Sequence, residues 1–103
     1  MIRVSVLYQN SEGKKFDMGY YCNQHIPMVK QKLGAACRRV DVDQGLSGAQ
    51  PGSQPAFVAI AHLLFDSVDS FRKAFGPHAD TIMGDIPNYT DIQPTIQINE
   101  VKM

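Results

Sequence analysis

The feature that most restricts the fold is an apolar run near the middle of the chain, residues 56–65, which reads AFVAIAHLLF. A strand with one solvated face alternates apolar and polar residues. This run is apolar on both alternations, interrupted only by His62. It therefore predicts a central strand that is covered on both of its faces.

Two elements are predicted before this strand. Residues 2–9 alternate with a period of two, which predicts a strand, and the turn-forming residues NSEGKK follow it. From Asp17, a suitable N-cap, apolar positions recur every three or four residues, which predicts a helix that ends at Gly34. Pro27 lacks a backbone N–H, so we expect it to interrupt the hydrogen bonding of this helix without ending it. The expected buried stripe comprises Met18, Tyr21, Cys22, His25, Val29 and Leu33.

The second half of the chain completes the pattern. We expect a strand at 36–46, a loop at 47–55, a second helix that starts at Asp66 or Ser67 and is interrupted at Gly76-Pro77, and a last strand carrying Ile96 and Ile98. The order β-α-β-β-α-β predicts an α+β, ferredoxin-like fold, with two helices on one face of a four-stranded antiparallel sheet. All of residues 1–103 are expected to form this one domain. A second copy is expected to cover the remaining apolar sheet face.

Composition narrows the possible partners. Hydrophobic residues make up 44% of the chain and charged residues 19%, which is typical of globular proteins. Ten basic residues balance ten acidic ones, so we expect no nucleic-acid partner. No segment has the apolar length of a membrane span, and the first residues lack a secretory pattern, so we expect a cytoplasmic protein without a membrane partner. Cys22 and Cys37 are expected to be free thiols.

Two segments of the chain resemble the EthD family, which is named for ethyl tert-butyl ether degradation. They are F-D-x-x-Y-Y-x-x-x-H-x-P at Phe16–Pro27 and D-I-P-N-Y-T-D at Asp85–Asp91, and the resemblance extends over nearly the whole chain. It implies a dimeric α+β barrel, in which the open sheets of two protomers pair and a small-molecule cavity lies between sheet and helices. It also implies a link to bacterial catabolism by oxygenases. The superfamily includes cofactor-free oxidoreductases and isomerases, so the resemblance does not select a reaction.

His25 is the main candidate for chemistry. It occupies a stripe position that an aliphatic residue would normally fill, one helical turn beyond Tyr21. Imidazole titrates near neutral pH, so His25 is a candidate general base or hydrogen-bond donor toward a bound carbonyl or phenol, with Tyr21 beside it. The alternative is a core histidine whose ring bonds a backbone carbonyl.

Further candidates come from the apolar pattern. The expected substrate-binding residues are Tyr8, Met28, Phe57, His62 and Phe75, although aromatic residues at such spacings also serve as core. Since His62 alternates with apolar neighbours, we expect it to point into an apolar layer. The three histidines lie on separate predicted elements without metal-ligand spacing, so we expect no metal and no other cofactor. Asp85 is expected to make a turn by bonding nearby backbone amides.

Three functions fit these residues. The first is a homodimer that binds a small apolar organic ligand and is accessory to, or part of, oxygenase-based degradation of an organic compound. The second is a cofactor-free oxidoreductase or isomerase in which His25 is the general base. The third is an assembly-only dimer without a ligand, which a fully packed space around His25 would favour. Open space beside His25 separates the third function from the other two.

Overall fold

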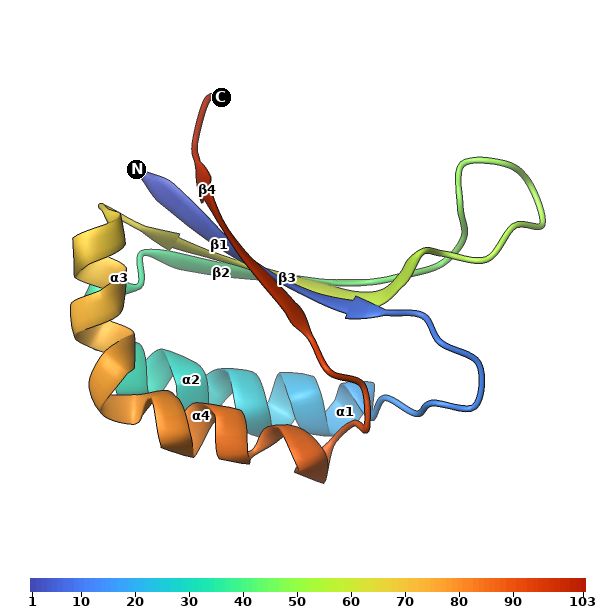
Figure 1. Cartoon of the computed structure of the whole chain (residues 1–103), viewed down its shortest axis with the longest axis horizontal. Coiled ribbons are helices and arrows are strands. Elements are labelled where there is room, and N and C mark those ends of the chain that lie inside the picture. The colour runs from blue at the N-terminus through green and yellow to red at the C-terminus, as the bar shows by residue number, and fades with distance from the viewer.

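Four antiparallel strands form the framework of the protein. The computed structural model describes residues 1–103. The sheet consists of β1 (Ile2–Gln9), β2 (Arg39–Gln44), β3 (Phe57–Phe65) and β4 (Thr95–Glu100). The strands lie in the order β2-β3-β1-β4, and each neighbouring pair is antiparallel. Helices pack on one side of this sheet (Figure 1). The α+β, ferredoxin-like prediction is thus confirmed.

Two helical segments, each interrupted, cover that face. The first contains α1 (Met18–Tyr20), a π-helical turn at Tyr21–His25, α2 (Ile26–Leu33) and a 3₁₀ turn at Gly34–Ala36. The second contains α3 (Val68–Phe75), a 3₁₀ turn at Gly76–His78, α4 (Ala79–Gly84) and a last 3₁₀ turn at Ile86–Asn88. Both segments lie on the same side of the sheet (Figure 1), which leaves the opposite side without helices.

The first helical segment starts and ends where its sequence predicts. The Asp17 carboxylate accepts the N–H of Tyr20 at 3.0 Å, and Gly34 ends α2 with φ at +63°, a conformation that side chains other than glycine rarely adopt. Just before Pro27, the N–H of Ile26 bonds the carbonyl of Tyr21, five residues back. The helix then continues, and Leu33 is buried. Pro27 therefore interrupts the hydrogen-bond pattern without ending the helix, as predicted.

The second half of the chain differs from expectation in detail. Ser67, not Asp66, caps α3 by accepting the N–H of Ser70 at 3.0 Å, while Asp66 pairs with Arg38 at the surface. The strand expected at 36–46 is shorter at both ends: Ala36 belongs to the 3₁₀ turn that follows α2, and β2 extends only from Arg39 to Gln44. The loop between β2 and β3 projects beyond the sheet (Figure 1). These differences leave the strand order and layers unchanged.

The central strand β3 has two unlike faces. Ala59, Ala61, Leu63 and Phe65 face the helices, and all four are buried. The alternate residues Val58, Ile60, His62 and Leu64 face the side without helices and are only partly buried. Within one chain, β3 is thus covered on a single face, and the expected cover of the second face is not supplied by the protomer itself.

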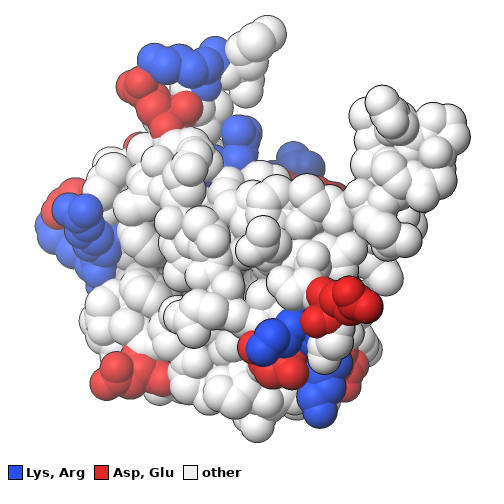
Figure 2. Space-filling view, turned by 45° about the vertical axis from the view of Figure 1, so that its right-hand side comes forward, with Lys and Arg blue, Asp and Glu red and all other residues white.

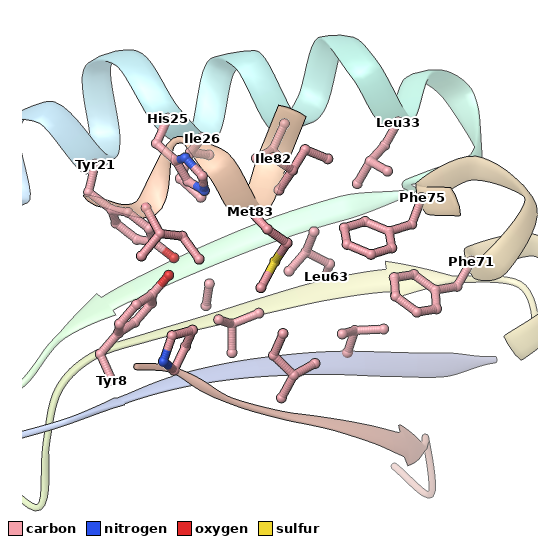
Figure 3. A pocket seen from close by; sticks show the side chains of 17 residues that line it. Tyr8, Tyr21, His25, Ile26, Leu33, Leu63, Phe71, Phe75, Ile82 and Met83 are labelled. Atoms are coloured by element: carbon pink, nitrogen blue, oxygen red, sulfur yellow. The ribbon is translucent and has the colours of Figure 1, made fainter. Parts of the chain in front are cut away.

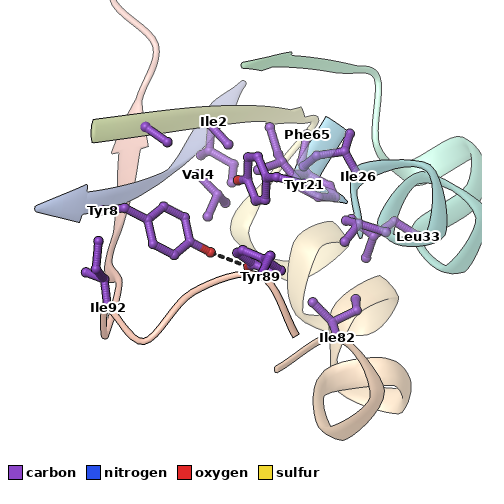
Figure 4. Packing of buried hydrophobic residues seen from close by; sticks show 14 residues of the cluster. Ile2, Val4, Tyr8, Tyr21, Ile26, Leu33, Phe65, Ile82, Tyr89 and Ile92 are labelled. Atoms are coloured by element: carbon purple, nitrogen blue, oxygen red, sulfur yellow. Dashed lines mark hydrogen bonds between the residues drawn. The ribbon is translucent and has the colours of Figure 1, made fainter. Parts of the chain in front are cut away.

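The core carries polar atoms along with its apolar packing. It is a cluster of 14 buried hydrophobic residues, and the largest fully buried side chains are Tyr8, Tyr21 and Phe65. Figure 4 shows the Tyr8 hydroxyl directed at Tyr89, and their oxygens lie 2.6 Å apart. Since a buried hydroxyl without a partner is costly, these tyrosines impose a specific arrangement on the core.

The surface carries no concentration of one charge in the view of Figure 2. Blue and red groups alternate around the edge, and the middle of this face is uncharged. This distribution agrees with the balance of ten basic and ten acidic residues. None of the helices has the length and apolar character needed to span a bilayer.

Candidate ligand site

A cavity of about 280 Å³ lies between the sheet and the helices (Figure 3). Its walls are apolar except at one end, where His25 and the hydroxyls of Tyr8 and Tyr21 meet. In Figure 3 those two hydroxyls point toward one another from opposite layers. Ligand sites commonly combine apolar walls with a few convergent polar groups. Typical wall residues are Val4, Val6 and Ile96 from the sheet and Val29, Phe75 and Ile82 from the helices.

The π-helical turn positions the polar residues of the helix. Tyr21 and His25 both lie on its inner face, with ring centroids 5.5 Å apart and planes inclined by 13°. Ile26 follows them into the core, whereas Cys22 is exposed. The prediction that Cys22 belongs to the buried stripe is wrong, because the wide turn adds a residue and moves Ile26 into that place. Such turns recur at functional sites.

Asp85 anchors His25 from the end of the second helical segment. Its Oδ2 accepts a hydrogen bond from His25 Nδ1 at 2.9 Å, and its Oδ1 accepts from the Tyr20 hydroxyl at 2.7 Å and from Asn88 Nδ2 at 2.8 Å. Partial burial alone would raise the pKa of Asp85, but these three donors outweigh it and the pKa lies below its ordinary value. Asp85 is therefore ionised at neutral pH and can only accept hydrogen bonds.

The charge state of His25 follows from its surroundings. Burial lowers the pKa of His25, and the hydrogen bond and charge of Asp85 oppose that shift only in part. The ring is therefore neutral at pH 7. Because ionised Asp85 accepts from Nδ1, the single ring proton is on Nδ1, and Nε2 carries a lone pair.

Two more tyrosines extend the contacts of His25. The Tyr89 hydroxyl lies 3.4 Å from His25 Nε2 and 2.6 Å from the Tyr8 hydroxyl. Burial raises the pKa of Tyr8, Tyr21 and Tyr89, so all three hydroxyls stay protonated near neutral pH. The result is a continuous series of hydrogen bonds from a cavity wall, through Tyr89, to His25 and Asp85.

The structure brings four of the seven predicted site residues together. Tyr8, Tyr21, His25 and Phe75 line the cavity. Met28 and Phe57 do not: Met28 packs against the outside of the core cluster, and Phe57 pairs with Gln9 beyond an irregularity in the strand register. Their assignment to the cavity is corrected.

His62 also lies outside the cavity, on the sheet face without helices. Its Nδ1 is 2.8 Å from the hydroxyl of Ser5, which also accepts a hydrogen bond from Asn99 Nδ2 at 2.9 Å. Asp41 is its register partner on β2. The expectation that His62 points into an apolar layer is wrong, because the neighbouring strands contribute polar residues to the same face.

Sequence reasoning misses Asp85 as part of the site and does not predict the contact of Tyr89 with His25. The sequence predicts that Asp85 bonds nearby backbone amides, but its carboxylate bonds three side chains. Both residues lie in D-I-P-N-Y-T-D, and the 3₁₀ turn at Ile86–Asn88 sets their spacing. The available signal was the joint occurrence of this segment with the histidine segment, about 60 residues earlier in the chain.

Solved structures with a similar fold indicate the class of protein. A match with a TM-score of 0.95 is the crystal structure of an EthD-like protein from Ralstonia eutropha JMP134, which is 48% identical, with 99% of this chain and 92% of that chain covered. An ethyl tert-butyl ether degradation (EthD) family protein from Bacillus halodurans C-125 is 20% identical, with a TM-score of 0.67 and 99% of both chains covered. A search of curated proteins finds no significant match.

A more distant match extends the fold comparison. A dimeric protein of unknown function with a ferredoxin-like fold, from Bacteroides fragilis NCTC 9343, is 12% identical, with a TM-score of 0.51 and coverage of 97% of this chain and 95% of that chain. Fold and cavity together define an α+β, ferredoxin-like protein with an internal ligand-sized space. The EthD domain model matches residues 11–93, and the chain belongs to the EthD family.

Proposed function

We propose that this protein binds a small, largely apolar organic molecule in the cavity between its sheet and helices. The observation that carries this proposal is the cavity itself, about 280 Å³ with apolar walls and a polar end formed by Tyr8, Tyr21 and His25. Its volume is at the lower end of the range for ligand sites, which suits a molecule of one or two rings. Open space beside His25 counts against an assembly-only protein.

The test is to identify what the cavity retains. Protein purified under non-denaturing conditions is analysed by mass spectrometry for bound organic molecules, in parallel with a Val6→Phe variant. Val6 is a partly exposed wall residue, so the larger ring fills the cavity at modest cost to the core. Molecules present in the wild type and absent from the variant are cavity ligands. If both proteins also fail to bind naphthalene added in solution, the proposal is wrong.

A second candidate function is cofactor-free acid–base chemistry, as in an isomerase or an oxidoreductase. The observation that favours it is the hydrogen bond from His25 Nδ1 to Asp85, which holds Nε2 as a base beside the cavity. A proton acceptor oriented by a carboxylate is more than ligand binding requires. The name of the Bacillus halodurans protein refers to ether degradation, and we place the ligand of this chain among the compounds formed in oxygenase-based catabolism.

We also propose that the protein is a homodimer formed through the sheet face without helices. Leu7, Val58 and Ile60 form an apolar patch on that face, with Leu64 beyond His62, and a neighbour in fold is described as dimeric. Light scattering after size exclusion should give twice the 11.4 kDa of one chain. The Ile60→Lys variant should be a monomer, because a charge buried at the centre of an apolar interface is costly. A wild-type monomer at micromolar concentration would contradict this assembly.

A further inference from the structure

The hydrogen-bond directions at the polar end of the cavity select a class of ligand, an inference that rests on the proposed binding function. Asp85 accepts from His25 Nδ1, so Nε2 can only accept. The arrangement that gives Nε2 a donor is the one in which the Tyr89 hydroxyl donates to it across 3.4 Å. In that arrangement Tyr8 is the donor in the 2.6 Å contact between the Tyr8 and Tyr89 hydroxyls.

This order decides what the cavity offers to a ligand. Tyr8 has spent its only proton on Tyr89, so its oxygen presents lone pairs to the cavity that it lines. The Nε2 lone pair of His25 is taken by the Tyr89 hydroxyl in this arrangement. Tyr21 supplies the remaining hydroxyl, which points toward the Tyr8 oxygen (Figure 3). This end of the cavity thus offers one acceptor oxygen, from Tyr8, beside one hydroxyl donor, from Tyr21, and the rest of the wall is apolar.

We propose that the cavity selects an aromatic or unsaturated molecule with a weakly acidic hydroxyl group, a phenol or an enol, over the corresponding ether. A ligand hydroxyl can donate to the Tyr8 oxygen while its own oxygen accepts from Tyr21. An ether oxygen can only accept, so it gives no donor to the Tyr8 oxygen at the buried end, which is unfavourable.

The same order provides a route for the ligand proton. The ligand O–H bond breaks as its proton moves to the Tyr8 oxygen, Tyr8 passes its own proton to Tyr89, and Tyr89 passes its proton to His25 Nε2. The electron pair of the broken bond stays on the ligand oxygen, which becomes a phenolate or enolate. The imidazolium so formed is paired with Asp85, 2.9 Å away. No oxidant or reductant takes part.

Three matched probes test the proposal: 2-naphthol, which has the hydroxyl, 2-methoxynaphthalene, which is the ether, and naphthalene, which has neither. Their own fluorescence reports binding, since the chain has no tryptophan. We expect the wild type to bind 2-naphthol about tenfold more tightly than 2-methoxynaphthalene, the effect of about one hydrogen bond. Tyr8→Phe should reduce the preference for 2-naphthol severalfold and retain naphthalene binding. The control is Cys22→Ala, a change at an exposed residue of the first helical segment, which should leave the preference for 2-naphthol unchanged.

Emission from bound 2-naphthol tests the proton route separately. Excited 2-naphthol is a strong acid and emits as naphtholate only when a base is in reach. The wild type should give naphtholate emission, and His25→Leu should give neutral naphthol emission at equal occupancy. Equal affinity for 2-naphthol and its methyl ether, or emission that does not depend on position 25, overturns the inference while leaving ligand binding intact. Failure of all three probes to bind overturns the proposed function as well.

Discussion

A histidine with polar partners lies on each side of the sheet, one in a helical turn and one in a strand, and the surroundings of the two differ. On the helix-covered face, His25 borders a cavity and bonds a carboxylate. On the open face, His62 bonds Ser5, and Ser5 bonds Asn99, within a surface of mixed polarity. A polar side chain in an apolar pattern therefore indicates a ligand site only where the tertiary structure leaves an enclosed space next to it.

The largest expected effect contrasts two neighbouring residues of β3. Phe65 is fully buried under the helices, and Phe65→Ala should lower the free energy of unfolding by about 3–5 kcal/mol. Leu64 lies on the open face, and the effect of Leu64→Ala should depend on protein concentration if it acts through the proposed dimer. Urea unfolding at two protein concentrations measures both. Equal effects of the two changes at every concentration would remove the distinction between the faces.

The next comparison exchanges the two histidines for leucine in turn. His25→Leu should weaken 2-naphthol binding about tenfold and leave the melting temperature equal or higher, because a polar ring gives way to an apolar one and Asp85 keeps two other donors. His62→Leu should leave binding unchanged. Probe titration and thermal unfolding of both variants provide the measurement. Unchanged affinity in His25→Leu at full occupancy would exclude His25 from the site.

The pH dependence of stability separates His25 from an ordinary exposed histidine. Burial holds the pKa of His25 below its ordinary 6.5, so below about pH 6.5 the unfolded chain binds a proton that the folded chain does not. The neutral His25 ring therefore makes its full contribution to the free energy of unfolding above that pH, and this contribution is lost as the pH falls toward the pKa of His25 in the folded protein. Urea unfolding should show that the wild type loses stability between about pH 7.5 and about pH 5.5. The His25→Leu variant should lack this loss of stability. Parallel curves would mean that the fold does not hold this ring neutral.

The smallest expected effect is on the open face. Ser5 is 5% exposed and bonds His62 and Asn99, so Ser5→Ala should lower the free energy of unfolding by about 1 kcal/mol. Binding of all three naphthalene probes should stay at the wild-type level, because Ser5 and the cavity are on opposite faces of the sheet. A loss of probe affinity in this variant would show that the two faces are coupled.

Much of the fold follows from local patterns in the sequence. The alternation in 2–9, the Asp17 cap and the stop at Gly34 locate β1 and the first helical segment, since each depends on neighbouring residues alone. The interruption at Pro27 is equally local, because a missing N–H acts within one turn. The apolar run at 56–65 correctly identifies the centre of the sheet. The pattern also predicts internal positions for His25, Tyr21 and Tyr8, and all three line the cavity.

The tertiary structure alone decided which polar residues meet. Asp85 and Tyr89 reach His25 because the second helical segment crosses the sheet beside the first, and no periodicity encodes that contact across about 60 residues. His62 and Phe57 were misplaced because the face of a strand and the end of a sheet depend on pairing with β1 and β2. Sequence thus determined the elements, whereas the packing of distant elements determined the cavity and which polar groups meet at its end.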